Sequence, residues 1–453
     1  MANASRRLRS DARLIWRRGV AAADAFHLTR TALRLERDVI RVGKMRVPLE
    51  GVGTIAVIGG GKAGAGMSRA VEQILGPKLL SVKNVHGWVQ VPDRTVRPLR
   101  AIQLWGARTK PDNRPTRRGV AGTRRIESIL ESLGESDLAL CLLSGGASAL
   151  LPAPVPGVSL ADKRRVTALL QEAGAPIHEI NAVRKHLSRV KGGGWARLFG
   201  GRRLIALILS DVVGDPIDVI ASGPTAPDRT TFAEAIRVLR RYGLWERSPR
   251  SVRTYLTAGA RGRHSETLKR LPGRVTNTII GNNRTALDGA ARAARTLGYH
   301  VSVLSPDLEG EASQAGSFLS RLARSVRDEG KPVRPPACLL AGGETTVSLG
   351  KSRGLGGRNQ ELALAALAAF AGDGMRDILI LSAGTDGEDG PTDAAGAIAD
   401  AQILRRARAR GLDPEVYLAR HDSYNFFAPL GGLLKTGPTG TNVMDLQVVL
   451  VGS

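Results

Sequence analysis

Cysteine is nearly absent from this chain of 453 residues, which contains only Cys141 and Cys338. Both lie in apolar, strand-like segments, where cysteine is typically a small, buried and reduced hydrophobic residue. No C-x-x-C pair occurs, and the seven histidines show no spacing typical of metal ligands. The G-x-S-x-G turn of serine hydrolases is also missing. These absences argue against a zinc hydrolase and a serine hydrolase.

Long apolar runs are missing as well. No segment approaches the roughly 20 apolar residues of a membrane-spanning helix. The Arg-rich N-terminus lacks the apolar core of a signal peptide. We expect it to form an amphipathic first helix with Leu14, Ile15 and Phe26 near one side. The simplest location for such a chain is the cytoplasm.

Acidic residues are outnumbered by basic ones, and the net charge is +25. Such a balance fits nucleic acid, an acidic membrane or small anionic substrates. The basic residues are spread over predicted helices, and they do not alternate with aromatic residues as in single-strand binders. We therefore expect a solvated basic surface. A basic nucleic-acid-associated protein stays as the third of three functional hypotheses.

One stretch combines the features of an anion site. In residues 55–68, IAVIGGGKAGAGMS, a β-branched apolar run leads into glycines and then into small residues. This pattern predicts a strand, a tight loop and a helix start, whose backbone N–H groups favour an anion. Lys62 adds a full positive charge at the same place.

Two familiar nucleotide-binding patterns do not fit this loop. Its glycines at 59, 61 and 64 match G-x-G-x-x-G, but no acidic residue occurs between Glu72 and Asp93, where the dinucleotide fingerprint expects one. Ala63 stands where the phosphate-binding P-loop requires Ser or Thr. An NAD(P)H-dependent reductase is therefore the alternative hypothesis, not the first.

Strands alternate with helices throughout, which predicts the α/β class: two α/β/α domains with mainly parallel sheets. We place the domains at residues 1–248 and 249–453, and leave the loop-like segment 94–122 unassigned. Ligands of such sheets bind beyond the carboxyl ends of the strands. At least six predicted strands end in Gly followed or preceded by Ser, Thr, Asn, Asp or Glu, which indicates a shared cleft.

Several of these loops, taken in order, carry a family resemblance over nearly the whole chain. The chain resembles the MOFRL-type glycerate 2-kinase family. The motifs are GGGKAG (59–64), LLSGGASALL (142–151), EINAVRKHLSRVKGG (179–193), LSDVVGDPIDVIASGPT (209–225), GN (281–282), AGGETTV (341–347), GGRNQELAL (356–364), SAGTDGEDGPTDAAGA (382–397) and TGPTGTNVMDL (436–446).

The resemblance implies a fold and an activity. It implies an N-terminal Rossmann-like domain, a C-terminal MOFRL-type domain and an active-site cleft between them. It also implies transfer of phosphate from ATP to D-glycerate, giving 2-phosphoglycerate, with a need for Mg²⁺. The substrate of the alternative reductase, hydroxypyruvate or tartronate semialdehyde, is likewise implied only by this family resemblance. Lys62 and Arg358 match the proposed catalytic pair of the family. Two departures stand out: Ala147 replaces the third glycine of the family's SGGG loop, and residues 105–115 lack its His-Pro-x-Pro-Asp stretch.

The chemistry of phosphoryl transfer suits these residues, because catalysis depends on positioning and on stabilising negative charge. Lys62 is a compact charge for the transferring phosphate, and Arg358 offers a planar fork for a carboxylate or phosphate. Asp211 and Asp386 are candidate Mg²⁺ ligands, and Asp211 is also a candidate for orienting the attacking hydroxyl.

Further candidates are expected to bind phosphate or substrate, with ATP and D-glycerate as the small-molecule partners. They are Gly60, Gly61, Ser144, Gly145, Gly146, Asn282, Glu344, Thr345 and Asn359. The sequence leaves the hydroxyl that is phosphorylated and the oligomeric state open, with a homodimer among the options.

Overall fold

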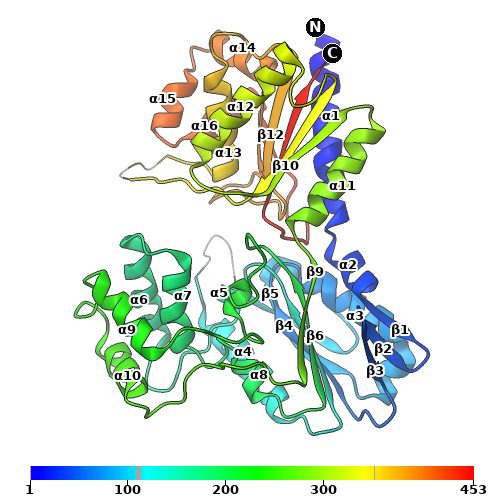
Figure 1. Ribbon diagram of the computed structural model, residues 1–453, viewed down its shortest axis with the longest axis vertical. Helices are drawn as coiled ribbons and strands as arrows, with labels where there is room; N and C mark the ends of the chain where they lie inside the picture. The colour runs from blue at the N-terminus through cyan, green and yellow to red at the C-terminus, as the bar shows by residue number, and fades with distance from the viewer. Residues whose placement is uncertain (1, 109–113, 351, 353, 453) are drawn as a thin grey trace. The chain divides into compact units, whose positions relative to one another are not determined.

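The computed structural model describes residues 2–108, 114–350, 352 and 354–452 and forms two compact units (Figure 1). The N-terminal unit comprises residues 25–210 and 215–280, and the C-terminal unit comprises residues 1–24, 211–214 and 281–453. These units differ from the expected division at 248/249, because residues 249–280 belong to the N-terminal unit and the first helix belongs to the C-terminal unit. Part of the departing loop at 105–115, residues 109–113, lies outside the described residues.

A six-stranded sheet in the order β6-β5-β4-β7-β8-β9 forms the centre of the N-terminal unit. This is the strand order of the Rossmann fold. The pairs β5/β6, β4/β5, β4/β7 and β7/β8 are all parallel, as expected. The strands are β4 (Ile55–Gly60), β5 (His86–Pro92), β6 (Ile102–Arg108), β7 (Leu138–Leu143), β8 (Arg203–Leu209) and β9 (Val275–Gly281).

Helices connect these strands, and four of them, α6, α7, α9 and α10, share an apolar cluster of their own. A small antiparallel sheet, β1 (Leu33–Glu36), β2 (Val39–Val42) and β3 (Met45–Pro48), precedes the main sheet. The helices are α2 (Ala25–Ala32), α3 (Gly64–Val82), η1 (Asp93–Thr95), α4 (Arg117–Glu131), α5 (Ala147–Leu150), α6 (Leu160–Glu172), α7 (Ile177–His186), α8 (Gly194–Leu198), η2 (Ile220–Ser222), α9 (Phe232–Arg241) and α10 (Arg250–Ala260).

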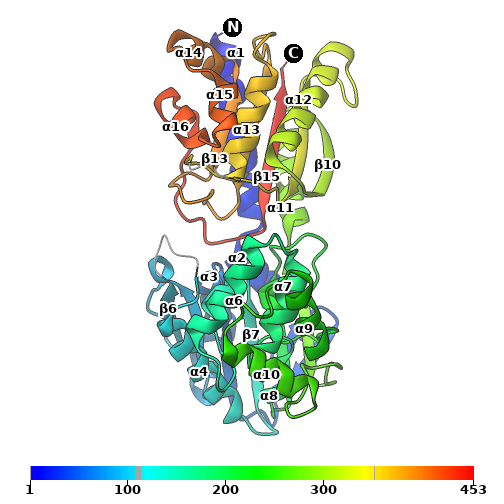
Figure 2. The ribbon, with the colours of Figure 1, turned by 90° about the vertical axis from the view of Figure 1, so that its left-hand side faces the viewer.

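The C-terminal unit has three layers. Its sheet runs β10-β11-β15-β12-β13-β14. Alternate residues along a strand point to opposite faces, so Cys338 and Leu340 of β11 pack against α1 and α11, whereas Leu339 packs against α12 and α13. In Figure 2, α12 and α13 lie in front of this sheet and α1 behind it.

The C-terminal sheet is more mixed than expected. β10 and β11 are parallel, but β15, the last strand of the chain, lies antiparallel between β11 and β12. Its strands are β10 (His300–Leu308), β11 (Ala337–Gly343), β12 (Ile378–Gly384), β13 (Gly396–Asp400), β14 (Leu433–Leu434) and β15 (Asp445–Val451). Its helices are α1 (Ala2–Ala22), α11 (Asn283–Thr296), α12 (Ala312–Glu329), α13 (Arg358–Ala369), α14 (Ala401–Ala409), α15 (Pro414–Ala419), α16 (Ser423–Phe427) and η3 (Ala428–Leu430).

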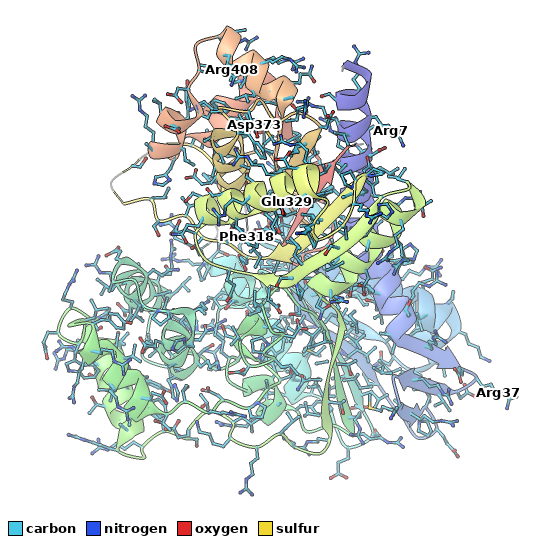
Figure 3. The ribbon with its side chains drawn as sticks, turned by 45° about the horizontal axis from the view of Figure 1, so that its top comes forward. Arg7, Arg37, Phe318, Glu329, Asp373 and Arg408 are labelled. Atoms are coloured by element: carbon cyan, nitrogen blue, oxygen red, sulfur yellow. The ribbon has the colours of Figure 1, made fainter. Side chains whose placement is uncertain are left out.

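Arginines cover the surfaces of both units. Arg7 of α1, Arg37 between β1 and β2, and Arg408 of α14 are exposed and project outward in Figure 3. This agrees with the expected solvated basic surface. Among the described residues, no helix is both long enough and apolar enough to span a bilayer.

Candidate functional site

Two glycine loops interlock at the carboxyl ends of β4 and β7. Because these strands are parallel neighbours, the loops that follow them meet at one edge of the sheet. The Lys62 N–H donates to Gly145 O (2.8 Å), and the Ala63 N–H donates to Ser144 Oγ (3.1 Å). Gly61 has a φ of +141°, and a Cβ atom there would overlap Ser144 Oγ. The glycines therefore allow the two loops to approach closely.

This interlocking corrects one expectation about the loop. The N–H groups of Gly61 and Gly64 donate to Gln90 O and Gly61 O, so all four N–H groups from 61 to 64 already have protein acceptors. They are not open to an anion. Ser144 is fully buried, and its hydroxyl is one of those acceptors.

What the loops present is the side chain of Lys62. It is half-buried and lies along the second loop, because a Cβ atom on Gly146 would stand 3.4 Å from Lys62 Cγ. Gly146 itself has a φ of +79°, which glycine adopts readily. Lys62 and the Ser-Gly-Gly loop therefore lie side by side within the N-terminal unit.

The structure also changes the argument against dinucleotide binding, which rested on a missing acidic residue after the second strand. α3 is 19 residues long, so the second strand, β5, ends at Pro92, directly before Asp93. An acidic residue therefore follows the second strand after all, further along the chain than expected. Its carboxylate lies 3.3 Å from Arg118. The reductase hypothesis is disfavoured for a different reason, because the N–H groups of the glycine loop are already bonded.

A polar cluster beside the Ser-Gly-Gly loop was missed by the sequence analysis. Arg184 of α7 and Lys191 both donate to Ser148 Oγ of α5, over 2.7 and 2.6 Å. The basic residues of EINAVRKHLSRVKGG are visible in the sequence. Their contact with Ser148 could not be predicted, because that serine lies 36 or more residues away in another motif.

Arg358 starts α13 in the C-terminal unit, where it is bonded to two carboxylates. Its Nε and Nη2 donate to the two oxygens of Asp445 (2.6 and 3.0 Å), and Nη1 donates to Glu344 Oε1 (2.5 Å). Burial alone would lower the pKa of Arg358, but the carboxylates of Asp445 and Glu344 outweigh this effect and raise that pKa. The guanidinium of Arg358 was expected to bind a ligand, but its Nε and Nη2 edge already binds Asp445.

Asp389 holds the start of α13. It is 2% exposed and accepts hydrogen bonds from the N–H groups and side-chain amides of Asn359 and Gln360. Asn359 is also buried, and its amide oxygen accepts from the Ser382 hydroxyl (2.6 Å). Asn359 therefore positions α13, and its amide does not point to a ligand as expected.

The candidate metal ligands Asp211 and Asp386 both belong to the C-terminal unit. Asn442 donates to Asp211 (3.0 Å), and Thr439, three residues earlier, donates its N–H to Asp386 O (3.2 Å). Across the described ranges, no three His, Cys, Asp or Glu side chains gather as a metal site. A Mg²⁺ site at Asp211 and Asp386 therefore stays a prediction.

The remaining candidates for phosphate or substrate binding are described by their contacts. Asn282 caps α11 by accepting from the Thr285 N–H. Burial raises the pKa of Glu344, and Asp445 adds to this effect. The hydroxyl of Thr345 is buried and has no partner among the described residues. Gly60 is the last residue of β4, and its carbonyl accepts from the Ser144 N–H.

Comparisons with known proteins match both halves of the chain. Residues 11–257 match a family described as "Domain of unknown function (DUF4147)", and residues 337–445 match the MOFRL family. The chain is 39% identical to glycerate 2-kinase of Pyrococcus horikoshii, covering 96% of this chain and 95% of that protein. It is 40% identical to D-glycerate 2-kinase of Thermotoga maritima (91% and 94%) and to human glycerate kinase (87% and 84%).

Solved structures give the same result. The crystal structure of glycerate kinase from Thermotoga maritima matches with a TM-score of 0.82 at 37% identity, covering 98% of this chain and 100% of that one. A protein from Pyrococcus horikoshii OT3 matches with a TM-score of 0.80 at 40% identity, covering 98% and 99%. The chain therefore belongs to the MOFRL-type glycerate 2-kinase family.

Proposed function

We propose that this protein transfers phosphate from ATP to D-glycerate and releases 2-phosphoglycerate. The observation that carries this proposal is the similarity, at 39–40% identity over 91–96% of the chain, to two proteins named glycerate 2-kinase. The structure supports it with a lysine that two glycine loops hold in place.

Lys62 is assigned to the transferring phosphate. Its main-chain N–H is fixed by Gly145, while its side chain is half-buried against Gly146 and carries a compact positive charge. In a loose transition state, negative charge spreads over the equatorial phosphate oxygens. A cation that is already oriented stabilises that charge without reorganisation.

Arg358 is assigned a second stabilising role. Asp445 and Glu344 orient the guanidinium and leave one N–H on each terminal nitrogen for other acceptors. The proposal therefore uses the outer edge of the Arg358 fork, not the edge that binds Asp445.

Mg²⁺ completes the proposed chemistry. When bound, it neutralises charge on the phosphate oxygens of the donor. Asp386 and Asp211 are the residues proposed to hold it, because both are half-buried carboxylates in the C-terminal unit.

The proposal is tested by incubating the purified protein with D-glycerate, ATP and Mg²⁺. It predicts a product that depends on all three. Folded protein that makes no phosphorylated glycerate would contradict it.

A further inference from the structure

The polar cluster beside the Ser-Gly-Gly loop is built from three elements of the N-terminal unit. Lys191 donates to Ser148 Oγ (2.6 Å), to Ser148 O (3.1 Å) and to Ser222 Oγ (3.3 Å). Arg184 donates to Ser148 Oγ (2.7 Å) and to Asn181 Oδ1 (3.4 Å). The two hydroxyls lie 2.8 Å apart. One serine hydroxyl is therefore shared by two cations.

These cations lack negative partners. In the described parts of the chain, all acceptors of Arg184 and Lys191 are hydroxyl, carbonyl or amide oxygens. A third buried cation, Lys163, donates only to the carbonyls of Arg184 and Leu187. Burial, and then the neighbouring cations, lower the pKa of Lys191 well below its usual value.

Lys185, on the same helix as Arg184, shows the usual arrangement. It is 3% exposed, like Lys191, but its ammonium lies 3.0 Å from Asp218 and 3.2 Å from Asp228. Burying a charge is costly unless an opposite charge compensates it. Since Arg184 and Lys191 have no such carboxylate, an anion from outside the chain would supply the opposite charge that stabilises both.

The cluster is open on one side. Arg184 and Ser148 are half-buried, whereas Lys191, Ser222 and Asn181 are buried behind them. The guanidinium of Arg184 has N–H groups beyond the two bonded to Ser148 and Asn181. Ser148 follows Gly146, which touches Lys62, by only two residues. An anion bound here would therefore lie close to the proposed phosphate site.

We propose that Arg184 and Ser148 bind the carboxylate of the acid substrate, with the ammonium of Lys191 behind them, an inference that rests on the proposed function. The planar fork of Arg184 matches a carboxylate in bidentate geometry. A phosphate of the nucleotide is the other source of an oxyanion, and the test separates the two.

The experiment compares the wild-type protein with Arg184→Gln, Arg184→Lys and Ser148→Ala. Calorimetric titration with D-glycerate gives the dissociation constant, and steady-state kinetics give separate KM values for D-glycerate and ATP. Arg241→Lys is the matched control, because Arg241 contacts Glu179 of α7 and has its carboxylate partner. Circular dichroism and thermal melting verify that each variant is folded.

The proposal predicts that Arg184→Gln raises Kd and KM for D-glycerate about tenfold to a hundredfold, because a charge-assisted pair is lost. The KM for ATP should change less than about threefold. Arg184→Lys should recover part of the loss, since it keeps the charge without the fork, and Ser148→Ala should have a smaller effect in the same direction.

Three results would contradict it. A rise in KM for ATP alone would assign the cluster to the nucleotide. Unchanged constants for both substrates, in a wild-type protein that turns over D-glycerate, would overturn the site and leave the proposed function standing. A folded wild-type protein that neither binds nor phosphorylates D-glycerate would overturn the proposed function, and this inference with it.

Discussion

Arg358 and Asp445 form a bidentate ion pair that joins the first residue of α13 to the first residue of β15. The two N···O distances are 2.6 and 3.0 Å, and the side chain of Asp445 is 1% exposed. The antiparallel insertion of β15 between β11 and β12 brings the carboxylate to this position. The last strand of the chain thus fixes the direction of the arginine on which the proposed chemistry depends.

Replacing Arg358 by lysine should therefore impair activity without a general loss of charge. Lysine keeps one positive charge but not the planar fork that binds Asp445. We expect kcat/KM for D-glycerate to fall by about tenfold or more, because at least one charge-assisted hydrogen bond is lost. Steady-state kinetics on both proteins measure this change.

Glu344→Gln provides the matched comparison for that variant. Glu344 binds the same guanidinium through a single contact and is more exposed than Asp445. Its loss should reduce kcat/KM less than Arg358→Lys does. An Arg358→Lys enzyme with unchanged kcat/KM would remove Arg358 from the proposed site.

Lys62→Ala should lower kcat by about a hundredfold to a thousandfold, because a preorganised charge at the transferring phosphate would be lost. The fold should survive, since the hydrogen bond from residue 62 to Gly145 uses the main chain. Kinetics together with thermal melting separate the two effects.

The control for Lys62 is Lys83→Ala in the same unit. Lys83 donates to Leu49 O and Val52 O and has no place in the proposed chemistry. Its replacement should lower the melting temperature and leave kcat near the wild-type value. Near-normal turnover by Lys62→Ala would show that the lysine is not catalytic.

Gly61→Ala should destabilise the N-terminal unit by about 3 kcal/mol or more. The new Cβ atom would overlap Ser144, in a backbone conformation that alanine rarely adopts. Gly43→Ala is the matched control, since Gly43 also has a positive φ, +57°, but no atom lies within 4 Å of the added Cβ.

Chemical denaturation of both glycine variants measures this difference. Gly43→Ala should cost only about 1 kcal/mol. Equal losses for the two substitutions would show that backbone conformation, and not the interlocking of the loops, explains the need for glycine at position 61.

The sequence was sufficient for the local features of the fold and of the candidate site. Apolar runs that end in glycine predicted the strands, whereas the structure shows that β4 and β7 are parallel neighbours and so brings Lys62 beside the Ser-Gly-Gly loop. The pairing of Arg358 with Asp445 was not predictable, because it depends on a strand 87 residues further along that inserts antiparallel.

The same physical limit explains the other differences. Asn359 looked like a ligand-binding residue in its motif, but Asp389, 30 residues away, occupies its side chain. Arg184 and Lys191 lay in a motif without an assigned role, because their shared acceptor, Ser148, comes from another motif. Residue patterns indicate which groups are present, and long-range packing decides which of them remain available.

Asp389 should make stability depend on pH. Burial, reinforced by Asp445, raises the pKa of Asp389 to about 6, even though N–H groups of Gln360 and Asn359 oppose this shift. The folded protein therefore binds a proton between pH ~4 and ~6 that the unfolded chain releases, so this contribution to stability is present below pH ~4 and is lost as the pH rises through ~6.

The free energy of unfolding measured from pH 4 to 6.5 tests this, with Asp389→Asn as the comparison. Asparagine does not titrate, so the difference in stability between the two proteins should change by about 3 kcal/mol across that range. Parallel pH profiles would contradict the raised pKa.

The most direct test of the account is phosphorus NMR of purified protein incubated with D-glycerate, ATP and Mg²⁺. The account predicts a 2-phosphoglycerate signal that requires all three and that disappears with Lys62→Ala. A 3-phosphoglycerate signal would keep the kinase and correct the hydroxyl that is phosphorylated. Folded wild-type protein that yields neither product would contradict the central claim.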